Sequence, residues 1–281
     1  MYFKTLEQKC LYYRGLTDYK LLPNSYVIVM LDGKNFSRLV KNKFKKPFDD
    51  DFISMMNETA KYVCENVQGC KFAYIQSDEI SLVLTDFDTP TTDTFFGNRL
   101  CKMQSIIASL ATAKFNQLMF QYKLKKHDYE RTKEDSDLSL YDIDDAINFI
   151  GEQDLFQFDC KCWNVPSIND VFAWFLYRQI DCVRNSKQQA AQAYLPHKKL
   201  LKLNTDAQIK LLIEEKDIDW NCYPMGQKYG RFIWKRKVIM TNIDTGEIYQ
   251  RHKWIEEPAF PLMDEDGKEK FFNIEAIPKM G

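Results

Sequence analysis

Two apolar runs in this chain end on acidic residues at a turn, and this pattern constrains the fold more than any other. The run Tyr26–Met30 leads into Leu31-Asp32-Gly33, and the run 72–75 leads into Ser77-Asp78-Glu79, after which a third apolar run covers 80–84. β-Branched and aromatic residues between turn-forming residues are typical of strands. We therefore expect three buried strands whose acidic turns can converge on divalent metal ions.

Carboxylates in this position suit phosphoryl transfer. Mg²⁺ is usually held by one or two protein carboxylates, with phosphates and water completing its shell. In nucleotidyl transfer two such ions, roughly 3.5–4 Å apart, clamp the attacking and leaving oxygens. Asp32 and Asp78 are the candidate ligands, and Gly33 lets the backbone approach a metal or phosphate. The alternative is that Asp-Gly is only a hairpin turn and 77–79 only a polar loop, but two such motifs after buried strands favour a site.

The hydrophobic periodicity predicts the order of elements up to residue 165. We expect an α+β fold with the order β-α-β-β-α-β, the split βαβ or ferredoxin-like arrangement. Its first strand lies beside the central pair, so Asp32 and Asp78 can end close together. The expected strands are 25–32, 71–76, 80–84 and 157–165, and the expected helices are 49–68 and 95–122.

The rest of the chain divides into an insertion and an extension. Residues 126–137 mix acidic and basic side chains with few apolar ones, so we expect an exposed, partly disordered insertion at 124–155. A palm-like catalytic core then covers 1–165, and a helical and β-rich extension covers 166–281. Within these parts we expect helices at 142–150, 169–193 and 206–215, and strands at 229–241 and 246–254.

Composition limits the environment of the protein. The chain is 45% hydrophobic and 28% charged, which is ordinary for a soluble globular protein. No apolar stretch approaches the roughly 18 residues needed to cross a bilayer, and the N-terminus does not resemble a signal peptide. The eight cysteines form no C-x-x-C pair, which favours free thiols in a reducing compartment over a zinc site. We therefore expect a cytoplasmic location and no membrane partner, with mitochondria not excluded.

Basic residues are clustered, although the net charge is only −1. The segment 41–46 interleaves lysines with an aromatic residue beside the first acidic motif, and Arg99 and Lys102 form an i, i+3 pair. Such clusters are more often solvated faces, but beside metal carboxylates they favour a triphosphate, which needs cationic partners besides its metals. Further clusters comprise Lys198, Lys199 and Lys202, and Lys228, Arg231, Lys235, Arg236 and Lys237.

Several linked motifs, taken in order, resemble the tRNA-His guanylyltransferase superfamily. The resemblance covers about residues 1–240, broken by the insertion at 124–155. It implies a 3′-to-5′ nucleotide polymerase that acts on the 5′ end of tRNA, with a palm-like core and a homotetrameric assembly. The motifs are Leu31-Asp32-Gly33-Lys34-Asn35-Phe36-Ser37-Arg38, Phe44-x-Lys46-Pro47-x-Asp49, Tyr74-x-Gln76-Ser77-Asp78-Glu79-x-Ser81, Phe158-Asp159-x-Lys161 with Pro166-Ser167, and Arg178-Gln179-x-Asp181.

The resemblance also implies two Mg²⁺ ions, with ATP and GTP as substrates. The 5′ end is activated with ATP, or already carries a triphosphate, and the 3′-hydroxyl of the incoming nucleotide attacks it. Asp32, Asp78 and the Gly33 carbonyl then hold the metals, with Glu79 as a supporting catalytic residue. Ser77 and Lys46 contact the activating nucleotide, and Arg99 and Lys102 face a triphosphate. The full set of implied nucleotide-binding residues is Lys34, Asn35, Phe36, Lys46, Ser77, Arg99, Lys102 and Lys161.

The chain also departs from the family pattern. Members that add guanosine to tRNA-His carry His-Ile-Asn-Asn-Leu-Tyr-Asn-Thr where this chain has the different segment 183–190. Lys161 replaces an arginine, which loses the bidentate fork, and Met30 stands where the tRNA-His enzymes have arginine. The chain thus resembles the Thg1-like branch, which repairs 5′-truncated tRNAs by templated addition.

Three functions stay open at this point. The leading one is templated repair or editing of tRNA 5′ ends. The second is addition of the extra guanosine to tRNA-His, and the missing His-Ile-Asn-Asn segment argues against it. The third is a non-catalytic RNA-binding relative, and intact Asp32, Asp78 and Glu79 argue against that.

Overall fold

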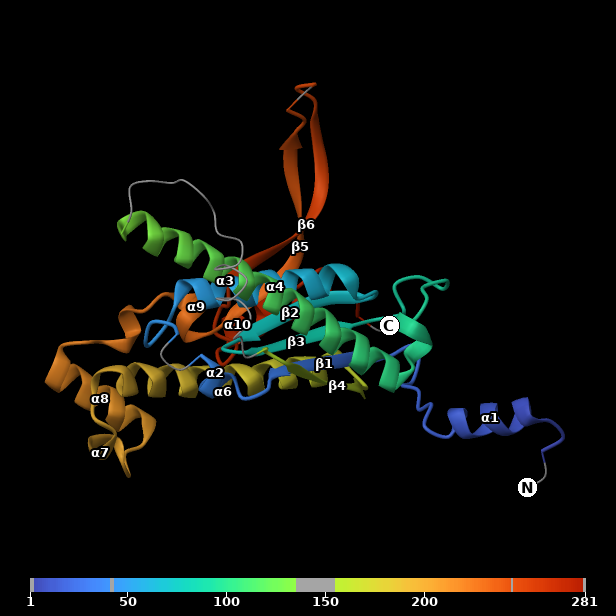
Figure 1. Ribbon diagram of the computed structural model, residues 1–281, viewed down its shortest axis with the longest axis horizontal. Helices are drawn as coiled ribbons and strands as arrows, with labels where there is room; N and C mark the ends of the chain where they lie inside the picture. Colours follow the sequence, from blue (N-terminus) through green and yellow to red (C-terminus); the bar gives the residue numbers. More distant parts are fainter. Residues whose placement is uncertain (1–2, 41–42, 135–154, 244, 280–281) are drawn as a thin grey trace.

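The computed structural model describes residues 3–40, 43–134, 155–243 and 245–279. These residues build one six-stranded antiparallel sheet with the strand order β4-β1-β3-β2-β5-β6 and with helices packed on both of its faces (Figure 1). The expected mixture of helices and sheet is confirmed. The strands are β1 (Tyr26–Gly33), β2 (Cys70–Gln76), β3 (Glu79–Leu84), β4 (Phe158–Val165), β5 (Arg231–Thr241) and β6 (Ile248–Pro258).

The helices follow local signals in the sequence. Asp49 caps α3 by accepting the N–H of Phe52 at 3.0 Å, and Ser167 caps α6 by accepting the N–H of Asp170. Within the described residues the helical segments are α1 (Leu6–Gly15), α2 (Phe36–Leu39), α3 (Asp50–Asn66), η1 (Phe95–Asn98), α4 (Leu100–Glu134), α6 (Ile168–Tyr194), α7 (His197–Leu200), α8 (Thr205–Lys216), η2 (Trp220–Cys222), α9 (Met225–Lys228) and α10 (Glu265–Phe272).

The first four strands, with α3 and α4 between them, follow one another in the expected order β-α-β-β-α-β. Strand β1 lies between β3 and β4 and pairs with both along its whole length. The end of β1 therefore lies next to the short turn that joins β2 to β3. This adjacency is what brings the two acidic motifs together.

Two differences from the sequence-based expectations concern the insertion and the extension. Helix α4 does not end near Tyr122 but continues to Glu134, so the first part of the expected insertion is helical. The rest of that insertion, with the short helix expected at 142–150, lies outside the described residues. In addition, β5 pairs with β2 through residues 231–234, so strands from beyond residue 166 continue the same sheet.

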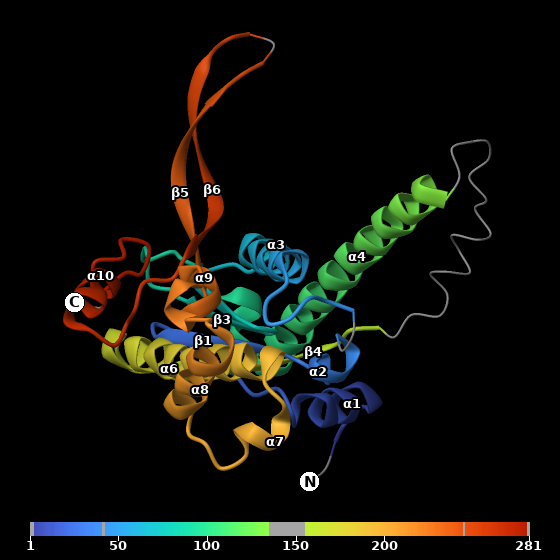
Figure 2. The same ribbon diagram turned by 90° about the vertical axis from the view of Figure 1, so that its left-hand side faces the viewer.

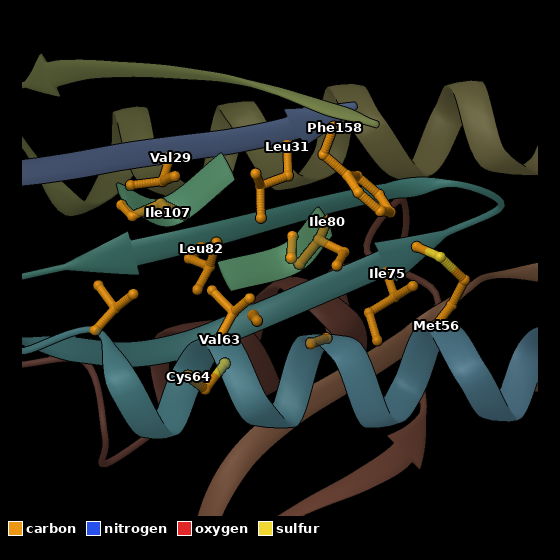
Figure 3. Close-up of a cluster of buried hydrophobic side chains, with 14 of the residues drawn as sticks. Val29, Leu31, Met56, Val63, Cys64, Ile75, Ile80, Leu82, Ile107 and Phe158 are labelled. Carbon is orange, nitrogen blue, oxygen red and sulfur yellow. The ribbon is translucent and has the colours of Figure 1, made fainter. Parts of the chain in front are cut away.

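Apolar side chains fill both faces of the sheet. On one face, residues of β1, β2, β3 and β4 pack against α3 and α4. Figure 3 shows side chains of this cluster, among them Leu31, Ile80 and Met56, pointing toward one another. On the other face, Phe72 and Phe232 pack against Val171 and Phe175 of α6. A smaller cluster joins the end of α6 to α8. The sheet is thus a central layer between two apolar cores.

Beyond residue 234, β5 and β6 pair only with each other and form a long hairpin that projects from the body of the molecule (Figure 2). Its outer residues are mostly exposed. Within the described part of the chain, no helix combines the length and the apolar character needed to span a membrane.

The apolar core between the sheet and α4 depends on Phe115. This ring is fully buried and contacts the rings of Phe36, Phe156 and Phe158. We expect Phe115→Ala to lower the free energy of unfolding by about 3–5 kcal/mol, because it leaves a cavity that these rings cannot close. Phe120→Ala, on the same helix but with a side chain that is 38% exposed, is the control. Urea denaturation measures both, and similar losses in the two variants would show that Phe115 has no special place in the core.

Candidate active site

Sheet register lines up three carboxylates at the end of β1. Asp32 lies directly opposite Glu79 of β3 on one side and Asp159 of β4 on the other. Residues opposite one another in antiparallel strands share a face of the sheet and have Cβ atoms about 4.5–5.5 Å apart. The three side chains therefore form one row, on the face that α6 covers.

Asp78 joins this row from the β2–β3 turn. Ser77 has a left-handed backbone conformation, with φ of 46°, which makes the turn tight. The Gly33 N–H donates to the Asp78 carbonyl oxygen at 3.2 Å and fastens the turn to the end of β1. As expected from the sequence, the structure brings Asp32 and Asp78 together.

The site holds more negative charge than its surroundings neutralise. Burial raises the pKa of Asp32, and the neighbouring Asp159 raises it further, against the opposing charges of Lys161 and Arg178. Burial also raises the pKa of Asp78, where the Ser77 hydroxyl lowers it and the charge of Asp32 raises it. Mutual repulsion of this kind is relieved by a cation between the carboxylates.

Glu79 differs from these two because its charge is paired inside the protein. It is 5% exposed, and the guanidinium of Arg178 donates to both of its oxygens, with Nε to Oε1 at 2.7 Å. Gln76 donates to the same carboxylate at 3.2 Å, and Arg178 also donates to Asp181 at 3.1 Å. Glu79 therefore connects the sheet to α6, and its part in catalysis stays a prediction.

A cavity of about 540 Å³ opens beside Asp32 and Asp78. This size is typical of pockets that hold small ligands. Four of the predicted nucleotide-binding residues line it, namely Asn35, Phe36, Lys46 and Ser77, together with Gly33.

The other predicted nucleotide-binding residues are not among the lining residues of this cavity. Lys34 is exposed and its Nζ lies 3.3 Å from Gln157 Oε1. Lys161 is exposed on β4, near enough to lower the pKa of Asp32. Arg99 forms an ion pair with Asp18, N to O 2.8 Å, and Lys102 lies over the ring of Phe96. Within this single chain, Arg99 and Lys102 lie away from the acidic pair because β3 runs away from the turn at Asp78 before α4 begins.

Phe36 and Gly33 also have a packing role that the sequence did not indicate. Phe36 is 2% exposed and packs among Phe115, Phe156 and Phe158, so it touches the cavity only as part of its wall. A Cβ on Gly33 would lie 2.4 Å from the Phe36 ring. The glycine is thus required by the close packing of this ring against the turn.

The sequence analysis did not assign a function to four residues that the structure places at the site. Asp159 and Arg178 belong to quoted motifs, but only the strand register and the fold of α6 show their contacts with the acidic row. Asn185 and Gln189 of α6 line the cavity. The signal that could have found Asp159 is its position at the start of a strand, matching Asp32 at the end of another.

The described residues at the end of β1 fit a hard divalent cation that takes only a few of its ligands from the protein. Among them, no group of three or more histidine, cysteine, aspartate or glutamate side chains is arranged around a common metal position. The remaining candidate ligands are the half-buried carboxylates of Asp32 and Asp78 and the backbone carbonyl of Gly33. Oxygen ligands that leave room for phosphate are the preferred environment of Mg²⁺.

The raised pKa of Asp78 predicts how stability depends on pH. Because the folded state binds a proton at this carboxyl more tightly than the unfolded state does, the ionised form destabilises the metal-free fold above the folded pKa. We expect Asp78→Asn to be more stable than the wild type at neutral pH. This advantage should shrink as the pH falls through the raised pKa toward 3.8, the ordinary value.

Thermal unfolding across this pH range, with a chelator present, measures the effect. Asp206→Asn is the control, because the contact with Lys187 lowers the pKa of that exposed carboxyl and removal of its charge should bring no gain. A stability gain of Asp78→Asn that stayed constant down to the lowest pH would contradict the assignment.

Known proteins resemble the chain over most of its length. Residues 7–166 match the family described as Thg1, tRNAHis guanylyltransferase. A bacterial tRNA(His) guanylyltransferase (Thg1)-like protein in complex with ATP is 30% identical with a TM-score of 0.76, covering 98% of this chain and 99% of its own. A second such bacterial structure, in complex with GTP, is 28% identical with a TM-score of 0.71, covering 96% and 99%. An uncharacterized protein of Acanthamoeba polyphaga mimivirus is 29% identical over 84% of this chain and 79% of its own length.

The family match covers more than half of the chain, and it includes both acidic motifs and β4. Members of this family are nucleotidyltransferases that process tRNA. The acidic row, the adjoining cavity and these similarities together lead to one conclusion: the chain belongs to the Thg1 family of tRNAHis guanylyltransferases.

Proposed function

We propose that this enzyme adds nucleotides to the 5′ end of tRNA in the 3′-to-5′ direction, copying the opposite strand. The observation that carries the proposal is the meeting of Asp32 and Asp78 at the wall of one nucleotide-sized cavity. In this proposal residues 1–165 are a polymerase-palm-like catalytic core and 166–281 its extension. The strand order β4-β1-β3-β2 of the antiparallel sheet supports that description.

The reaction joins two groups in this cavity. The 3′-hydroxyl oxygen of the incoming nucleotide forms a bond to the 5′ phosphorus of the RNA. The bond from that phosphorus to its activating group breaks, the hydroxyl proton is released, and AMP or pyrophosphate leaves. Activation comes from ATP, or from a triphosphate that the RNA already carries.

The residues have distinct parts in this chemistry. Asp32, Asp78 and the Gly33 carbonyl would hold Mg²⁺, which, when bound, stabilises charge on the attacking and leaving oxygens. Lys46 and Ser77, both exposed at the cavity, contact phosphate oxygens of the activating nucleotide. Lys161 contributes positive charge beside Asp32.

A specific observation favours repair over addition of guanosine to tRNA-His. The segment 183–190 lies in α6, and its residues Asn185, Ser186 and Gln189 line the cavity. This is the segment that lacks the His-Ile-Asn-Asn sequence, so the difference from the tRNA-His enzymes falls on the substrate cavity itself. The family match keeps guanosine addition as the second candidate.

Other parts of the proposal rest on the family alone. We infer a homotetramer, in which Arg99 and Lys102 would face a triphosphate in a cavity to which more than one chain contributes. The substrate tRNA places the enzyme in the cytoplasm or in mitochondria. A non-catalytic RNA-binding role would require the acidic pair to have no chemical use, and the uncompensated charge at Asp32 argues against it.

One experiment separates the two activities. Purified protein, Mg²⁺, ATP and GTP are incubated with tRNA lacking its first 5′ nucleotide and, separately, with full-length tRNA-His. We expect addition to follow base pairing with the opposite 3′-strand nucleotide and to favour the truncated RNA. Equal or faster non-templated guanosine addition to full-length tRNA-His would make guanosine addition the main activity.

Removal of either carboxylate tests the site. We expect Asp32→Ala and Asp78→Ala each to reduce nucleotide addition by about 10²–10³-fold or more, because each removes a charged contact made in the transition state. The fold should be retained, since these carboxylates repel one another in the metal-free protein. Single-turnover rates and circular dichroism measure the two effects, with Asp206→Asn as an exposed control. Activity near the wild-type level in a folded variant would exclude the proposed site.

A further inference from the structure

Arg231 is a buried guanidinium in the wall of the cavity, and the reaction described above does not use it. It is 8% exposed and is the first residue of β5. In the sheet it lies opposite Ile75, two residues before Ser77. Arg231 and the acidic pair therefore line the same cavity from neighbouring parts of the sheet.

The hydrogen-bond partners of Arg231 are neutral. Its Nε donates to Asn57 Oδ1 at 2.7 Å, and one terminal nitrogen donates to the Gly226 carbonyl oxygen at 3.1 Å. Among the described residues, no carboxylate forms an ion pair with it. Burial raises the pKa of the nearby Cys182 and Tyr74, so both are neutral at pH 7, and Glu256 is paired with Lys61 at 2.6 Å. A guanidinium has five N–H donors, so three are left without a partner in the described residues.

Burying a cation without a counter-ion is unfavourable, because the charge loses its hydration. The two hydrogen bonds do not explain why a charge is kept there, because a neutral donor could make them. Burial lowers the pKa of Arg231 from its ordinary value, but arginine stays protonated in proteins. The immediate surroundings of Arg231 therefore lack one negative charge.

The remaining donors indicate the kind of group that supplies this charge. A guanidinium fork matches the geometry of phosphate oxygens and binds them with strong, charge-assisted hydrogen bonds. Ile75, which lies opposite Arg231, belongs to the core on the α3 and α4 face, and Arg231 bonds to Asn57 of α3. The acidic row lies on the face that α6 covers, so Arg231 faces a different part of the cavity from the acidic pair. A ligand that spans the cavity can thus meet cationic and acidic groups at separate points.

We propose that Arg231 binds a phosphoryl group of the nucleotide that enters this cavity, as an anion-binding residue separate from Asp32 and Asp78. This inference rests on the proposed function only in taking the cavity to be a nucleotide site. Binding measured without RNA therefore tests it independently of turnover. If the enzyme bound nucleotides through Arg231 but extended no tRNA, the proposed function alone would fail.

The test compares Arg231→Gln with the wild type by isothermal titration calorimetry. The probes are inorganic tripolyphosphate, ATP and adenosine, each with Mg²⁺. We expect tripolyphosphate and ATP to bind about 10- to 100-fold more weakly to the variant, since a charge-assisted hydrogen bond is lost, and adenosine to bind unchanged. Arg236→Gln is the matched control, because Arg236 lies on the same strand and is 53% exposed.

A second variant covers the case in which Arg231→Gln does not fold. Asn57→Asp keeps the size of the side chain but places a carboxylate at 2.7 Å from Nε, the distance that Asn57 Oδ1 now has. This internal counter-ion should raise the thermal unfolding temperature and weaken tripolyphosphate binding by about tenfold or more. A merely structural Arg231 would show the first effect without the second.

Three results would overturn the proposal. The first is unchanged tripolyphosphate binding in folded Arg231→Gln. The second is an equal loss of adenosine and ATP binding, which would assign Arg231 to the base or to the shape of the cavity. The third is a folded Asn57→Asp variant that binds tripolyphosphate as tightly as the wild type.

Discussion

The ion pair between Glu79 and Arg178 is the interaction on which the rest of the site depends. It joins the first residue of β3 to the middle of α6, across 99 positions of the chain. A buried pair of this kind is stable only when its remaining polar atoms are also satisfied. Gln76, Ser81 and Asp181 supply those contacts. With α6 fixed in this way, its residues between 182 and 193 form one wall of the cavity.

The two adjacent carboxylates at the β2–β3 turn thus differ in whether a cation within the protein is paired with them. Glu79 has its charge offset within the protein, so it contributes to the architecture. Burial raises the pKa of all three carboxyls, but Glu79 is hydrogen-bonded to a guanidinium, whereas Asp78 and Asp32 form no ion pair among the described residues. This lack of an internal partner is typical of groups whose counter-charge arrives with a substrate or a metal ion. Arg231 shows the same pattern with the opposite sign, because it too is buried without an internal counter-ion.

Much of the fold could be predicted because its signals are local. Apolar runs between turn-forming residues identified β1 to β4, and helical spacing identified α3 and α6. The meeting of Asp32 and Asp78 followed from the order of the elements alone. The rest depends on contacts between distant residues. The pairing of Arg178 with Glu79 can be predicted only once the position of α6 on the sheet is known. The distance of Arg99 from the acidic pair likewise follows from the direction in which β3 runs. The length of α4 was missed because its last turns carry few apolar residues.

The position of the turn that follows Asp32 is ultimately set by the hydrophobic core. Phe36 closes over Gly33 from the α4 side and is itself enclosed by Phe115, Phe156 and Phe158. Two backbone hydrogen bonds, from Gly33 to Asp78 and from Lys34 to Gln157 at 2.8 Å, then hold the strand end between β3 and the segment before β4. The acidic groups cannot separate to reduce their repulsion without disturbing this packing. The core therefore keeps the carboxylates at a spacing that the metal-free protein would not favour, and this is the preorganisation that a metal-dependent transfer requires.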